Sequence, residues 1–118
     1  KNFPTIQPEM NLGTLVKLVA ESKRNIFSVV NENNIFLGII NLDDIRKVMF
    51  DQSLYTKFTV SDLMHQPMGS IKLYDPMDKV MAKFKETGAW NLAVTCQGEY
   101  IGFISKSKLF SNYRRKLG

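Results

Sequence analysis

Few side chains of this 118-residue sequence are arranged for catalysis. Asp43 and Asp44 are adjacent, and neighbouring residues of a helix point about 100° apart, so their carboxylates cannot act on one substrate as an acid–base pair. His65 is the only histidine and has no Cys or His at metal-binding spacing, which favours an ordinary surface histidine. Cys96 is the only cysteine and is expected to be an unpaired bystander thiol. With no phosphate loop or nucleophile elbow, the sequence predicts a protein that is not an enzyme.

Polar residues also follow two apolar segments, where helices are expected to begin. Asn41 and Asp44 stand three residues apart and resemble a capping box, which stabilises a helix start by about 0.5 to 2 kcal/mol without any ligand. Ser105 is expected to cap a later helix in the same way. A purely structural role is therefore one interpretation of all three residues.

The elements that position these residues begin with an amphipathic helix. Its apolar side chains recur at helical spacing, in the order Leu12, Leu15, Val16 and Val19. Asn11 is expected to cap this helix. Two apolar strands at residues 26–30 and 35–40 are joined by a polar turn, which predicts a hairpin, and a second helix is expected from about Leu42 to Phe50.

The second half contains the same order of elements. A helix is expected to begin at Pro76, capped by Asp75, and to end at Gly88. Its predicted apolar face consists of Met77, Val80, Met81 and Phe84. A hairpin over residues 91–104 follows, and another helix is expected from Ser105.

The two halves therefore form an internal repeat. Val29 matches Val94 at an offset of 65 residues, and Gly38 matches Gly102 at an offset of 64, so the first hairpin is one residue longer. The pattern predicts an α/β (α+β) protein of tandem βαββα units, each with a small sheet covered by helices on one side. We expect the two units to pack as one pseudo-two-fold globule with a shared core.

This organisation predicts repeat one over residues 1–50, a linker over 51–68, and repeat two with a basic C-terminal helix over 69–118. One helical turn is expected at residues 60–64. Trp90 and the methionines are expected to cover or fill the cores.

Charge and hydropathy bound the class of protein. Sixteen basic and eleven acidic residues leave a net charge of +5, which the basic residues after Ser105 supply, and one basic end without a basic stripe disfavours nucleic-acid binding. That end is interpreted first as a docked helix, with Leu109, Phe110 and Tyr113 as its apolar face, and second as a surface that meets anionic lipid. No apolar stretch is long enough to span a bilayer. Because the chain starts at Lys1 without Met or a signal-like stretch, we expect a fragment of a longer protein.

The repeated order of helix, hairpin and a Gly-h-h-(Ser/Thr)-x-x-Asp helix start, around the Val-x-Asp-Leu-Met segment at residues 60–64, resembles a cystathionine-β-synthase (CBS) domain pair, or Bateman module. The resemblance covers nearly the whole chain. It implies a cytosolic regulatory module, often homodimeric, that requires no cofactor and in many members binds adenine nucleotides between the repeats.

Four segments are more narrowly similar to the C-terminal CBS pair of prokaryotic CLC-type chloride channels and transporters. They are residues 22–27, 42–46, 88–92 and 100–108. This resemblance implies a soluble domain of an integral membrane protein, at the cytoplasmic face of the membrane. Its partners would be a second copy and the membrane-embedded transport domain of the same parent chain.

The family motif also implies roles for single residues, and each repeat keeps only part of it. In that motif the hydroxyl meets phosphate or ribose, and the Asp holds the ribose hydroxyls through both carboxylate oxygens. Repeat one keeps Asp44 but has Asn41 in place of Ser/Thr. Repeat two keeps Ser105 but has Lys108 in place of Asp. Lysine has donors and no acceptor, so at most one cleft has the features of a conventional nucleoside site.

The resemblance therefore implies AMP, ADP or ATP as candidate ligands. Asp44 would hold the ribose, and Asn41 would lie beside the sugar or phosphate. The backbone of Thr5 and Ile6, or of Ser70 and Ile71, would line the base. Two alternatives stay open: a ligand-free CBS pair that serves only dimerisation, and a regulatory CBS pair of a soluble enzyme such as a nucleotide-synthesis dehydrogenase.

Overall fold

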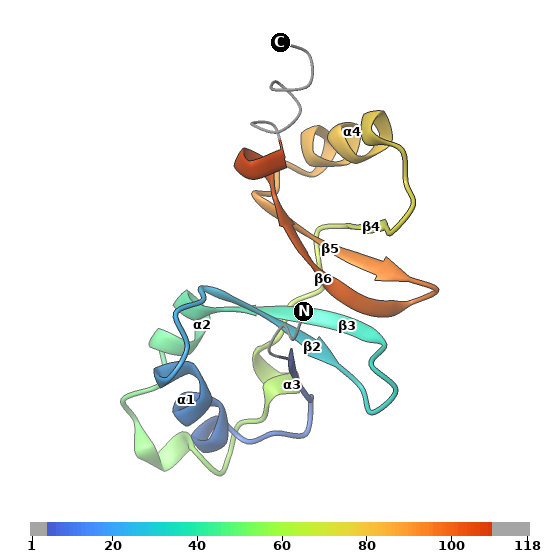
Figure 1. The fold of residues 1–118 in the computed structure, drawn as a ribbon. Coiled ribbons are helices and arrows are strands. Elements are labelled where there is room, and N and C mark those ends of the chain that lie inside the picture. Colours follow the sequence, from blue (N-terminus) through green and yellow to red (C-terminus); the bar gives the residue numbers. More distant parts are fainter. Residues whose placement is uncertain (1–4, 110–118) are drawn as a thin grey trace. The chain divides into compact units, whose positions relative to one another are not determined.

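The computed structural model describes residues 5–109 of the chain. The chain divides into two compact units, with the boundary between Gln66 and Pro67. Within the described residues each unit has one three-stranded sheet, and helices lie on one face of it (Figure 1). The predicted mixed α/β fold of repeated β-α-β-β order is thereby confirmed.

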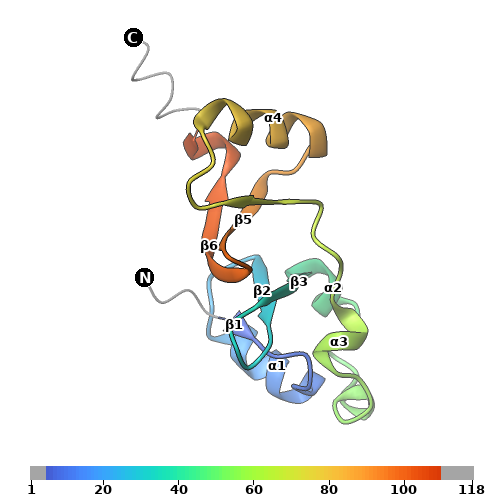
Figure 2. The same ribbon diagram turned by 90° about the vertical axis from the view of Figure 1, so that its right-hand side faces the viewer.

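The first unit contains β1 (Thr5–Ile6), α1 (Leu12–Ala20), β2 (Ile26–Val30), β3 (Phe36–Asn41), α2 (Leu42–Arg46), the 3-10 helix η1 (Gln52–Leu54) and α3 (Val60–Leu63). The second unit contains β4 (Ser70–Lys72), α4 (Met77–Thr87), β5 (Asn91–Cys96) and β6 (Glu99–Ser105). In both sheets the central strand pairs in parallel with the first strand and antiparallel with the third. Figure 2 shows α4 running across the upper ends of β5 and β6. No helix among residues 5–109 is long and apolar enough to cross a membrane.

Local signals in the sequence account for α1 and for both hairpins. Asn11 caps α1 as predicted, because its Oδ1 accepts a hydrogen bond from the backbone N–H of Thr14 at 2.9 Å. The β5–β6 turn places Gln97 and Gly98 at positive φ angles of 53° and 88°, as a tight two-residue hairpin requires. Gly88 ends α4 at φ 70°, as predicted.

Each unit has its own cluster of buried apolar side chains. The first cluster comprises Ile6, Leu12, Leu15, Val19, Phe27, Val29, Ile40, Ile45 and Val60. The second, smaller cluster comprises Ile71, Val80, Phe84, Ala89, Leu92 and Val94. In α1 the buried residues Leu12, Leu15 and Val19 recur at the predicted helical spacing, and in α4 Val80 and Phe84 do.

Most of the segment predicted as a linker, residues 51–68, packs within the first unit. Val60 of α3 is fully buried in the first core. The backbone N–H of Leu12 donates to the carbonyl of Phe58 at 2.9 Å, and that of Val60 donates to the carbonyl of Met10 at 2.8 Å. The predicted helical turn is present as α3, and it forms a wall of the first core.

Three expectations about single elements were wrong. Helix α2 ends at Arg46 rather than near Phe50, because the following residues form tight turns, in which Val48 donates to the carbonyl of Ile45 and Asp51 to that of Val48. The Tyr55 hydroxyl donates to the carbonyl of Met49 at 2.5 Å. Trp90 does not cover the core: it is 71% exposed, and the Nζ of Lys106 lies 5.1 Å from its ring centroid. Asp75 does not cap α4, whose N-cap is Pro76.

The methionines are also divided between the interior and the surface. Met49 and Met64 pack against the first core, as expected. Met68 and Met77 are instead exposed, by 67% and 40%. Ser105 caps the helical residues 106–109, since its Oγ accepts from the N–H of Lys108 at 3.2 Å. The rest of the predicted basic helix, with Phe110 and Tyr113, lies outside the described residues.

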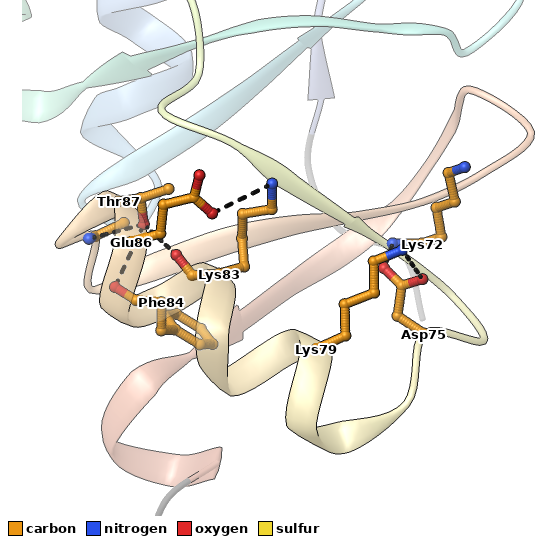
Figure 3. A network of polar contacts seen from close by, with 8 residues as sticks. Lys72, Asp75, Lys79, Lys83, Phe84, Glu86 and Thr87 are labelled. Atoms are coloured by element: carbon orange, nitrogen blue, oxygen red, sulfur yellow. Dashed lines mark hydrogen bonds and ion pairs between the residues drawn. The ribbon is translucent and has the colours of Figure 1, made fainter.

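The carboxylate of Asp75 closes the turn between β4 and α4 (Figure 3). Its Oδ2 accepts a hydrogen bond from the backbone N–H of Lys72 at 2.8 Å, and its Oδ1 lies 3.6 Å from the Nζ of Lys79. The backbone hydrogen bond, with the positive charge of Lys79 added, lowers the pKa of Asp75 below its ordinary value of 3.8. The ionised form is therefore favoured in the folded state.

A lowered pKa predicts a contribution to stability that is present above the ordinary pKa and is lost as the pH falls through the folded-state pKa. We expect Asp75→Asn to lower the urea midpoint at pH 7 and to reduce the further loss between pH 5 and pH 2. Asp78→Asn, in the exposed first turn of α4, is the matched control. An acid-dependent loss in Asp75→Asn as large as that in the wild type would refute this role.

Candidate functional site

A polar pocket of about 430 Å³ lies in the first unit where β3 passes into α2. Its lining residues are Asn25, Asn41, Leu42, Asp43, Asp44 and Arg46. Strand pairing builds it: Asn41 lies opposite Ile26, and the N–H of Leu42 donates to the carbonyl of Asn25 at 2.8 Å. The structure thus brings together two predicted site residues, Asn41 and Asp44, and adds Asn25 and Arg46.

The capping-box interpretation of this helix start was wrong. Asn41 occupies the N-cap position of α2, but its side chain makes no capping hydrogen bond. The carboxylate of Asp44 is used elsewhere, as its Oδ2 lies 2.7 Å from the Nε2 of His65. Asp43 pairs instead with Arg46, at 3.0 Å between Oδ1 and Nη1. The two adjacent carboxylates therefore have different partners, as expected from their divergent directions on a helix.

His65 is the site residue that sequence reasoning missed. It follows α3, 21 residues beyond Asp44 in the chain, and no local pattern connects the two. The backbone brings them together, because the N–H and carbonyl of His65 bond to the carbonyl and N–H of Ile39 at 2.8 and 3.0 Å. The only available signal for the Asp44–His65 contact was that an apolar strand is followed by the motif residue Asp44, and that the next polar segment contains His65.

Gly38 makes this close approach possible. A Cβ at Gly38 would lie 2.6 Å from the carbonyl oxygen of His65, closer than real Cβ contacts occur. The motif glycine of repeat one is therefore required here by the protein's own backbone. Any larger residue would push the segment carrying His65 away from β3.

The equivalent position in repeat two has the same backbone arrangement and different side-chain chemistry. The N–H of Lys106 donates to the carbonyl of Trp90 at 2.8 Å, which matches the bond from Leu42 to Asn25. Ser105 is engaged as a helix cap, as described above. Lys108 is exposed and presents no acceptor.

The predicted base-lining segments lie on the first strand of each sheet. Ile6 and Ile71 are buried in their cores, so their side chains are unavailable and only the backbone could meet a ligand. Thr5 pairs with Ser28 on the first strand, β1, and it is not among the residues that line the pocket around Asp44. Ser70 is exposed and belongs to the second unit. Among residues 5–109 no three His, Cys, Asp or Glu side chains are grouped to hold a metal ion.

Comparison with known proteins places this fold. No curated protein matches the chain. OpuCA from Staphylococcus aureus has a solved structure with a TM-score of 0.79 at 19% identity, covering 98% of this chain and 96% of that one. The solved structure of CBSX2 in complex with AMP has a TM-score of 0.77 at 20% identity, covering 99% of this chain and 91% of that one. The solved structure of CbpB in complex with c-di-AMP has a TM-score of 0.76 at 15% identity, covering 98% of this chain and 79% of that one.

These likenesses concern the fold. The family model of the CBS domain matches residues 1–51 and again residues 60–115. The two matches agree with the two sheets and with the internal repeat. This chain belongs to the CBS domain family and is a CBS pair.

Proposed function

We propose that this chain is a regulatory CBS pair whose first repeat binds an adenine nucleotide through Asp44. The observation that carries the proposal is the pocket at the start of α2, which is lined by both Asn41 and Asp44. Its volume of about 430 Å³ is within the range of small-molecule sites. The solved complexes of CBSX2 with AMP and of CbpB with c-di-AMP support this ligand class. In this proposal both oxygens of the Asp44 carboxylate accept hydrogen bonds from two ribose hydroxyls.

The charges that line the pocket favour a ligand with few phosphates. Asp43 and Asp44 contribute two carboxylates, and Arg46 contributes one guanidinium, which already pairs with Asp43. A triphosphate would meet more negative than positive charge. We therefore place AMP before ADP and ATP as the ligand.

The proposed parent is a CLC-type chloride channel or chloride/proton exchanger, with the CBS pair at the cytoplasmic face of the membrane. The four segments similar to CLC-type pairs support this parent. A ligand would alter transport only by binding one gating arrangement better than another. Upstream sequence with many long apolar helices would support the parent, and an upstream catalytic domain would refute it in favour of a soluble enzyme.

Isothermal titration calorimetry and thermal shift with AMP, ADP and ATP test the nucleotide site. A nucleotide at 100 times its dissociation constant is expected to add about 2.7 kcal/mol of stability. Asp44→Ala should weaken binding by roughly 1.5 to 3 kcal/mol, the range for hydrogen bonds to a charged group. Lys108→Ala, in the second repeat, should change it less.

Two results would contradict the site. Unchanged affinity in Asp44→Ala would show that the nucleotide binds elsewhere. Absence of binding at millimolar nucleotide would favour the alternative, a structural pair whose only activity is dimerisation.

Homodimerisation is the second part of the proposal. Within the described residues several large apolar side chains are exposed, among them Phe50 and Tyr74, each 87% exposed, and Trp90. Burying exposed apolar side chains in a dimer contact would remove their apolar surface from water. Sedimentation velocity at micromolar protein should show a species of about 27 kDa, twice the 13.5 kDa of one chain. A single 13.5 kDa species would argue against it.

A further inference from the structure

The imidazole of His65 already occupies the carboxylate that the proposed ligand would use. Its Nε2 lies 2.7 Å from the Oδ2 of Asp44, a short hydrogen bond. The Asp44 side chain is 21% exposed and that of His65 is 54% exposed. The Asp44 side chain is therefore largely covered by the pocket, and the His65 side chain is largely open to solvent.

The backbone of His65 is held independently of its side chain. Both of its backbone polar groups bond to Ile39, and the glycine at position 38 lets the two segments approach closely. Preceding it, the N–H of Met64 donates to the carbonyl of Val60 at 2.9 Å. The imidazole can consequently rotate away from Asp44 into solvent without breaking any of these backbone hydrogen bonds.

We propose that His65 is a built-in competitor for the carboxylate of Asp44, which a ligand with two adjacent hydroxyls must displace. The inference rests on the proposed nucleotide site. A vicinal diol uses both carboxylate oxygens, and the imidazole holds one of them in the free protein. The free energy of the histidine–aspartate contact is subtracted from that of ligand binding, so His65 sets the affinity threshold of the site.

The competition predicts that removing the imidazole tightens binding. We expect His65→Ala to bind AMP about 3- to 10-fold more tightly than the wild type, the factor that corresponds to one net hydrogen bond. His65→Gln keeps an N–H donor and should stay closer to the wild type. Gln66→Ala, at the adjacent exposed position, is the matched control and should leave the affinity unchanged.

Calorimetric titration of the 118-residue chain and these variants with AMP gives distinguishable results. Tighter binding in His65→Ala alone, or binding that is detectable only in that variant, supports the competition. Equal or weaker binding in His65→Ala, with the wild type binding AMP, overturns the competition and leaves the nucleotide site in place. Absence of binding in every variant overturns both the nucleotide site and the competition that depends on it. Circular dichroism of each variant checks that the fold is retained.

Discussion

The pair of backbone hydrogen bonds between Ile39 and His65 determines the arrangement of the first repeat. Through it the chain that leaves α3 runs beside β3, which joins residues 51–66 to the first unit. The contact requires a glycine at position 38, because a Cβ there would meet the His65 carbonyl at 2.6 Å. It also carries the imidazole to the mouth of the pocket around Asp44. Together with the backbone bonds from Leu12 to Phe58 and from Val60 to Met10, this close approach holds residues 51–66 in the first unit, and it brings His65 to the site.

The two repeats share a backbone plan and differ in what they present at the same place. In both, the first residue after the third strand donates to the carbonyl of the residue before the central strand. Repeat one then presents a carboxylate, an amide and a guanidinium around a pocket. Repeat two presents Ser105 as a helix cap, and the ammonium group of Lys106 lies over the exposed ring of Trp90. Of these two arrangements only the first contains a carboxylate that could accept from two ribose hydroxyls, which is why the proposed function is assigned to repeat one.

Features set by interactions between residues close in the sequence were predicted correctly, and features set by contacts between distant residues were not. Helix α1, both hairpins and the end of α4 were predicted because the signals are local: the cap at Asn11, the turn at Gln97 and Gly98, and the glycine at position 88. The end of α2 and the exposure of Trp90 depend on contacts made by residues elsewhere in the chain. The Asp44–His65 contact joins residues 21 positions apart through strand pairing, so no local pattern could reveal it. The sequence motif identified Asp44 as a candidate site residue, and only the structure showed that its partner is His65.

The most direct measurement is NMR of the histidine side chain, since the chain has a single histidine and its imidazole signals are unambiguous. Long-range proton–nitrogen correlations report hydrogen bonding at Nε2. If the carboxylate of Asp44 holds the imidazole, the Nε2 resonance of the free wild type differs from that of Asp44→Ala, and saturating AMP moves the wild-type resonance toward the value in that variant. Identical Nε2 resonances in the free wild type and in Asp44→Ala would contradict the contact on which the site depends.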